Sequence, residues 1–206
     1  MCNGNPFFPR GRLVTQSIIV LLGTNATATY NIAYSIMLLN QAFVSPISTA
    51  MFTISGICMG NNRPEDVRYL TKSFIWFGNV LYVFALGIVI LFFDFLVGFY
   101  NAPTEVIPLI YKCVMLTGIL HPFLHSTAFI LPSVFRAVGD GVYSTVSTLV
   151  IMWVFRVFGG YVLGIWCHMG IMGIWIAMLL DWVVRIVVFL IRFKGNRWLD
   201  HKVILN

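Results

Sequence analysis

The apolar run GIMGIWIAMLLDWVVRIVVFLIRF, residues 170–193, holds a complete acid–base pair, Asp181 and Arg185. A run of this length can cross a membrane, because a spanning helix needs about 20 mostly apolar residues. Arg156 is a third charge, placed inside the preceding apolar run. A charge at such depth costs roughly 2.5–3.5 kcal/mol on insertion scales. We therefore expect these side chains to pair, to line a wet cavity or to carry function.

The composition indicates an integral membrane protein with several spans. Of the 206 residues, 59% are hydrophobic and only 10% are charged, whereas soluble domains carry about 25% charged residues. Mean hydropathy is +0.89. The net charge of +6 does not indicate nucleic-acid binding, because the basic residues lie at the ends of apolar segments. The four cysteines are scattered singly, which does not favour a metal cage or a disulfide framework.

Six apolar segments predict an all-α integral membrane fold, a bundle of six transmembrane helices. The first is too short to span alone, and the longest exceed one straight crossing of about 30 Å. Residues 1–11 are expected to be irregular or a truncated helix start, and residues 199–206 a cytoplasmic tail. The expected helices within the 12–198 region are 13–23, 27–60, 67–100, 104–139, 142–166 and 170–193.

The basic residues predict the orientation of the chain. If each segment crosses once, ten of the thirteen fall on one side and none in the opposite loops. Lysine and arginine accumulate on the cytoplasmic side of membrane proteins. The pattern therefore predicts cytoplasmic termini and an even number of crossings, including the short first segment. The ten residues are Arg10, Arg12, Arg63, Arg68, Lys72, Arg136, Arg192, Lys194, Arg197 and Lys202.

The fourth segment combines three prolines with two histidines. Prolines kink or break membrane helices, and broken helices near the midplane are common at transporter binding sites. His121 and His125 are four residues apart, so they share one helix face. Such a pair serves either as a hydrogen-bonded helix contact or as a site of proton coupling or substrate contact. A metal site is disfavoured because no third ligand is indicated.

The expected depths of Arg156 and Asp181 in the membrane are close enough for the two side chains to meet. Counting along helices that run in opposite directions places them about 8 Å apart in depth, within reach of an arginine side chain. Arg185 lies one turn beyond Asp181 on the same face. The cluster is either a fixed ion pair between helices or a charge relay that changes with conformation. Asn31, Asn40 and Gln41 are polar groups at bilayer depth that either bond between helices or line a cavity, and Asn31 and Gln41 are the candidates for a substrate cavity.

No motif for an enzyme or an ATP-driven pump is present. The chain has no phosphate-binding loop, and no Ser/His/Asp or metal-hydrolase arrangement is found. The sequence therefore predicts neither an enzyme nor a bound cofactor.

Five strings together resemble the C-terminal half of MATE proteins, the multidrug and toxic compound extrusion transporters. They are RLVTQSIIVLLGTNATATYNIAYSI (12–36), GICMGNNRPEDVR (56–68), LPSVFRAVGDG (131–141), MWVFRV (152–157) and GIMGIWIAMLLDWVVRIVVFLIRFKGNRW (170–198). The resemblance implies twelve helices in two six-helix lobes with substrate between the lobes. It also implies export of organic cations in exchange for sodium ions or protons. The six segments here would form one lobe.

The resemblance has two departures. The chain carries one lobe, so a complete cleft needs a separate N-terminal lobe or a second copy, and the chain is expected to be a fragment. In some relatives an acid lies eleven residues before the arginine matched by Arg136, and here His125 occupies that position. A histidine favours protons over sodium ions as the coupling cation.

The main hypothesis is a drug:cation antiporter lobe in a bacterial inner membrane, surrounded by lipid and acting on a small organic cation. A lipid-linked sugar flippase of the wider superfamily is an alternative, because Arg156 and Arg185 suit a cavity lined by basic residues. A non-transporting remnant or scaffold is the third hypothesis.

Overall fold

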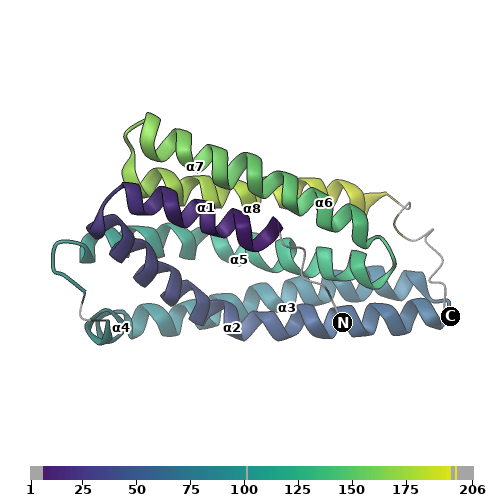
Figure 1. The fold of residues 1–206 in the computed structure, drawn as a ribbon. Coiled ribbons are helices and arrows are strands. Elements are labelled where there is room, and N and C mark those ends of the chain that lie inside the picture. The colour runs from purple at the N-terminus through teal and green to yellow at the C-terminus, as the bar shows by residue number, and fades with distance from the viewer. Residues whose placement is uncertain (1–6, 101, 196–197, 199–206) are drawn as a thin grey trace.

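The computed structural model describes residues 7–100, 102–195 and 198, and every regular element in that part of the chain is helical. The helices run nearly parallel or antiparallel in an elongated bundle (Figure 1). The elements are α1 (Phe7–Leu21), α2 (Thr24–Gly60), α3 (Pro64–Leu91), α4 (Phe93–Phe99), α5 (Ile107–Ala137), α6 (Gly141–Ile151), the π-helical η1 (Met152–Phe158), α7 (Gly159–Tyr161), the π-helical η2 (Val162–Trp166) and α8 (Gly170–Lys194).

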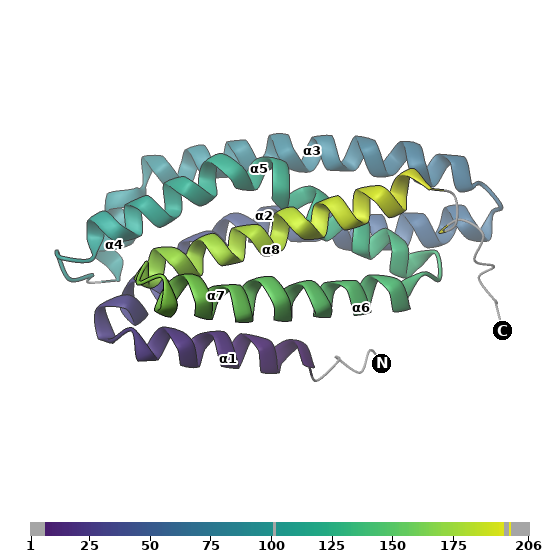
Figure 2. The ribbon, with the colours of Figure 1, turned by 90° about the horizontal axis from the view of Figure 1, so that it is seen from above.

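Successive connections alternate between the two ends of the bundle. In Figure 2 the α1–α2, α4–α5 and η2–α8 connections lie at the left, and the α2–α3 and α5–α6 connections lie at the right. Residues Gly141–Trp166 form one continuous helical rod that includes α6, η1, α7 and η2. This rod lies between α1 and α8 (Figure 2). The up-and-down order is the one expected of a chain that crosses a membrane repeatedly.

The turns between helices use residues that suit a left-handed backbone or a helix start. Gly23 and Gly139 have φ of 97° and 96°, conformations that a side chain would strain. After α5 the Asp140 N–H donates to the Phe135 carbonyl at 2.8 Å, so the last turn of the helix closes on itself. Pro64 opens α3 at a position where its missing N–H costs no hydrogen bond.

The number of helices able to cross a membrane is smaller than the six predicted. Within the described residues, four helices are long and apolar enough, and the bent helix α2 makes a fifth. Helix α1 has 15 residues, about 22 Å of helix, which is short of the hydrocarbon thickness. The protein is thus an all-helical, multi-pass membrane protein. Six crossings, and with them a six-helix transmembrane bundle, stay a prediction.

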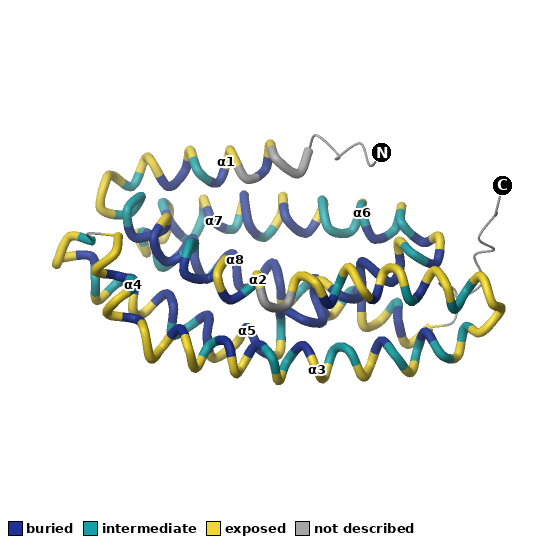
Figure 3. The backbone as a smooth tube through the Cα atoms, turned by 90° about the horizontal axis from the view of Figure 1, so that it is seen from below, coloured by how far each residue is buried: buried dark blue, intermediate teal, exposed yellow. Residues whose placement is uncertain are grey.

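The surface of the bundle is apolar where lipid would lie. Exposed positions, yellow in Figure 3, run along α3, whereas α8 and the inner face of α5 are largely buried. Large apolar side chains such as Trp76, Phe84 and Leu91 are mostly exposed on α3. Exposed residues of this size on a soluble protein would mark an interface, and here they form a lipid-facing surface.

The fourth segment, predicted to be kinked or broken by its prolines, is one continuous helix with a displacement between its halves. Helix α5 is continuous through Pro122 and Pro132, although its two halves are visibly offset in Figure 2. The sharp bend, 43°, lies in α2 between Thr24–Ala42 and Ser45–Gly60. Pro46 follows that bend at once, and its ring removes the hydrogen bond to the Ala42 carbonyl. A proline permits a kink, but packing against neighbours decides how far the helix turns.

Several helix boundaries also differ from the expected ones. The helical backbone begins at Phe7, inside the stretch 1–11 that was expected to be irregular or a truncated start. The expected 67–100 helix divides at Phe92 into α3 and the short α4, and α3 begins three residues early, at Pro64. The expected 104–139 helix begins at Ile107 and ends at Ala137. The predicted tail, residues 199–206, lies outside the described residues.

Helix α8 and the rod beside it approach closely because of two glycines. A Cβ on Gly173 would lie 2.5 Å from the Leu163 carbonyl oxygen and 2.9 Å from the Gly164 nitrogen. A Cβ on Gly164 would lie 2.8 Å from the Ile174 side chain. Small residues allow membrane helices to pack backbone against backbone. The pair η2 and α8 is therefore packed as tightly as two helices can be.

We expect Gly173→Ala to destabilise the protein by about 1–3 kcal/mol, because the new methyl group meets backbone atoms that have little room to move. Thermal unfolding of the purified protein in detergent measures the change. The matched control is Gly87→Ala in α3, where a Cβ would meet nothing within 4 Å. Equal stability of the two variants would contradict the close contact.

Candidate functional site

An aromatic and ionisable centre lies where α3, α5 and α8 meet. His121 is fully buried and His125 is 3% exposed, and their ring centroids are 4.7 Å apart. The His121 Nδ1 shares a hydrogen bond with the Tyr82 hydroxyl from α3. Trp182 of α8 covers His121 with a centroid separation of 4.2 Å, and Phe129 covers His125 at 4.3 Å. The predicted histidine pair thus exists as a packed unit of three helices.

Both histidines keep one ring nitrogen without a protein partner. His121 Nε2 and His125 Nδ1 are buried and make no hydrogen bond, and the Ser126 hydroxyl beside them makes none either. Buried polar atoms normally find a partner, so each exception calls for an explanation. An imidazole with a free nitrogen can accept a proton. The centre therefore has the chemistry of a proton acceptor inside the bundle.

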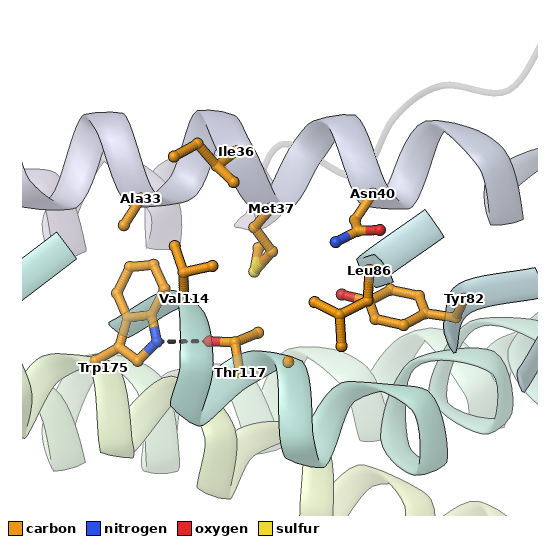
Figure 4. Close-up of a pocket in the computed structure, with 10 residues that line it drawn as sticks. Ala33, Ile36, Met37, Asn40, Tyr82, Leu86, Val114, Thr117 and Trp175 are labelled. Atoms are coloured by element: carbon orange, nitrogen blue, oxygen red, sulfur yellow. Dashed lines mark hydrogen bonds between the residues drawn. The ribbon is translucent and has the colours of Figure 1, made fainter. Parts of the chain in front are cut away.

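A small cavity adjoins this centre. Its volume is about 10 Å³, and it is bounded by α2, α3, α5 and α8. Asn40 of α2 and Tyr82 of α3 both lie at its right-hand end in Figure 4. The Asn40 Oδ1 is buried without a partner, and Trp175 Nε1 donates to Thr117 Oγ1 at 2.7 Å on the far side. A space of this size holds about one water molecule, so it can connect the centre to Asn40 by one hydrogen-bonded step.

Asp181 and Arg185 form an ion pair within α8. The Arg185 Nη2 lies 2.9 Å from Asp181 Oδ1 and 3.0 Å from Oδ2. Asp181 is fully buried and Arg185 is 4% exposed. Each charge therefore finds its counter-charge one helical turn away, without help from a second helix. The geometry favours a fixed, neutralised pair over a mobile charge relay.

Arg156 does not join that pair. No ion pair links it to a carboxylate among the described residues, and it lines a separate pocket of about 200 Å³ with side chains of α1 and α2. The predicted contact between Arg156 and Asp181 is therefore not seen. Similar depth in the membrane does not fix the direction of a side chain around its helix. Arg156 also lies in η1, where π-helical bonding departs from the α-helical period.

Of the two polar residues predicted to line a cavity, Asn31 does so and Gln41 lines neither cavity. Asn31 is exposed at the Arg156 pocket and accepts a hydrogen bond from Gln16 Nε2 at 3.3 Å. Gln41 is half-buried on α2. Sequence reasoning missed Tyr82, because a tyrosine in an apolar helix is equally compatible with a lipid-facing position. Asn40 carried a signal, since it is a polar residue at bilayer depth.

The described residues do not form a metal site. No group of three or more His, Cys, Asp or Glu among them could hold a metal ion. His121 and His125 each have a buried ring nitrogen without a hydrogen bond, but no described third ligand joins them.

The fold and the buried centre define a multi-pass helical membrane protein with an ionisable group in its interior. A model of the MatE family matches residues 7–162, three quarters of the chain. The chain therefore belongs to the MatE family, whose members are transporters.

Curated relatives support the same assignment. The chain is 24% identical over 195 residues to "Probable multidrug resistance protein NorM" of Thermotoga maritima, which covers 94% of this chain and 42% of the relative. It is 24% identical over 191 residues to "Uncharacterized transporter YisQ" of Bacillus subtilis, which covers 92% of this chain and 41% of the relative. The chain thus spans about two fifths of the length of these relatives. None of the solved structures matches the chain significantly.

We expect Asp181→Ala to lower stability by about 3–5 kcal/mol, because it leaves the buried Arg185 charge without its partner. The yield of monodisperse protein in detergent and its thermal midpoint measure the loss. Asp94→Ala, at an exposed aspartate of α4, is the matched control and should leave both unchanged.

The double variant Asp181→Leu with Arg185→Met tests whether the pair is only structural. Replacing both charges by apolar groups of similar size is often neutral or stabilising, so yield should recover. Failure of the double variant to recover would contradict a purely structural pair and would favour the charge relay.

Proposed function

We propose that the chain is one lobe of a secondary active transporter that exports organic cations in exchange for protons, with sodium ions as the alternative coupling ion. Three observations support this. The chain belongs to the MatE family. The Thermotoga relative is named as a multidrug resistance protein. The chain also buries a histidine pair with free ring nitrogens at the junction of three helices. The histidine pair is the main support, because exchanging protons for a substrate requires a group that can gain and lose a proton.

The coupling role falls on His121 and His125. In this proposal His125 takes up the proton, and the His121–Tyr82 hydrogen bond relays the change to α3. Protonation adds a charge inside a packed apolar junction, so it favours an arrangement in which water or a counter-charge reaches the histidines. Asp181, the third residue predicted for coupling, has a weaker case, because its charge is already held by Arg185.

The proposed setting is a bacterial inner membrane with both termini in the cytoplasm. With this orientation, the helix ends that carry basic residues lie on the cytoplasmic side. Arg63, Arg136 and Arg192 lie at or next to the connections and helix end that Figure 2 places at the right. A cleft between two lobes then needs an N-terminal lobe from a longer chain or a separate one, or a second copy of this chain.

We expect cells lacking their own efflux pumps to extrude a cationic dye when they produce this chain together with an N-terminal MatE lobe. Collapsing the proton gradient should stop extrusion, whereas removing sodium ions should not. Dye retention measured with the chain alone and with the paired lobes tests activity. Unchanged retention in both cases would overturn the proposal, and extrusion that follows sodium would reassign the coupling ion.

We expect His125→Gln and His121→Gln to abolish the part of extrusion that depends on the proton gradient, because glutamine keeps polarity but takes up no proton. His168→Gln is the matched control, since His168 is exposed in the connection before α8. Surface expression checks that each variant folds. Unchanged proton-driven extrusion in both interior variants would contradict coupling at this pair.

A further inference from the structure

A second polar pocket lies outside the histidine centre, between α1, α2 and η1. Its volume is about 200 Å³. Helix α1 supplies one wall and α2 the other, and η1 closes the space with a single charged side chain. The lining residues are Thr15, Gln16, Tyr30, Asn31, Tyr34 and Arg156.

Arg156 gives this pocket a positive charge, and no carboxylate among the described residues pairs with it. The side chain is 91% buried, since 9% of its surface is exposed, and no described carboxylate lies within ion-pair distance. A guanidinium stays protonated in proteins. A charge kept at this depth without a protein partner is costly, and an anion bound in the pocket would offset that cost.

The neighbouring groups are neutral and suit an anion. Gln16 Nε2 donates to Asn31 Oδ1 at 3.3 Å, and the rings of Tyr30 and Tyr34 stack at 5.6 Å. No acidic side chain lines the pocket. Arginine, glutamine and tyrosine all donate hydrogen bonds, and a guanidinium binds carboxylate or phosphate with two parallel bonds.

The size of the pocket limits the ligand to one small group. Drug-sized molecules occupy pockets of about 300–1,000 Å³, and 200 Å³ is less than that. The space corresponds to about seven water molecules at about 30 Å³ each. It accommodates a phosphate or carboxylate with the first atoms attached to it.

We propose that this pocket binds the oxyanion of an organic molecule, a phosphate or carboxylate group, through Arg156. The inference is independent of cation export, because Arg156 repels a cation and places the positive group of any exported drug elsewhere. Two sources share this chemistry, a lipid head group and a soluble organic anion, and the experiment separates them.

The test uses the 206-residue chain in nanodiscs of neutral phosphatidylcholine, titrated with phenyl phosphate and with benzoate by calorimetry. We expect saturable binding that weakens by about tenfold or more in Arg156→Gln, since hydrogen bonds to charged groups are the strong ones. Arg63→Gln is the matched control, because Arg63 is an exposed arginine far along the chain and outside the pocket. It should leave the affinity unchanged.

A second variant keeps Arg156 and adds a carboxylate of the protein itself to the pocket. Asn31→Asp places a carboxylate in the same pocket, at an exposed position where folding tolerates it. It should weaken binding of both anions as Arg156→Gln does. Agreement between the two variants supports the site even if one of them folds less well.

Three outcomes would overturn the proposal. They are absence of saturable binding to the unmodified chain, equal affinity in Arg156→Gln, and tighter binding of tetraethylammonium than of either anion. Repeating the titration in nanodiscs that contain phosphatidylglycerol identifies the source. Competition by the anionic lipid assigns the pocket to a lipid phosphate, and unchanged affinity assigns it to a soluble anion.

Discussion

The ion pair between Asp181 and Arg185 lets helix α8 occupy the interior of the bundle. Two charges one turn apart neutralise each other within a single helix, so α8 needs no water and no charged neighbour at that depth. One face of α8 can then pack against its neighbours along most of its length, while Leu180, Val187 and Ile191 stay exposed on the other. Trp175 bonds to Thr117 of α5, and Trp182 covers His121. The histidine centre is therefore built on a helix whose own charges are already balanced.

The sequence was sufficient to predict features that depend on composition and on the helical period. It was insufficient to predict contacts that depend on how each helix is rotated about its own axis. Apolar runs predicted where helices lie, although one expected helix divides at Phe92, and the i,i+4 spacing predicted that His121 and His125 share a face. Depth alone placed Arg156 beside Asp181, but side-chain direction sends it to another pocket. Tyr82 could not be found from one helix, because its role exists only where α3 meets α5.

The interior holds two polar regions of opposite character. The histidine centre is compact and closed, with a cavity about the size of one water molecule. The Arg156 pocket is some twenty times larger and carries a permanent positive charge. One suits a transferable proton, and the other suits a bound anion. They share no lining residue, but their walls touch where the Tyr30 ring meets the Trp175 ring, with centroids 5.7 Å apart.

The close contact between Gly173 and the backbone of Leu163 has a mechanical consequence. The two backbones lie so close that no side chain fits between them at this point. The spacing between α8 and the η2 end of the rod Gly141–Trp166 is therefore set by the glycine at position 173, since any larger residue would push the two helices apart.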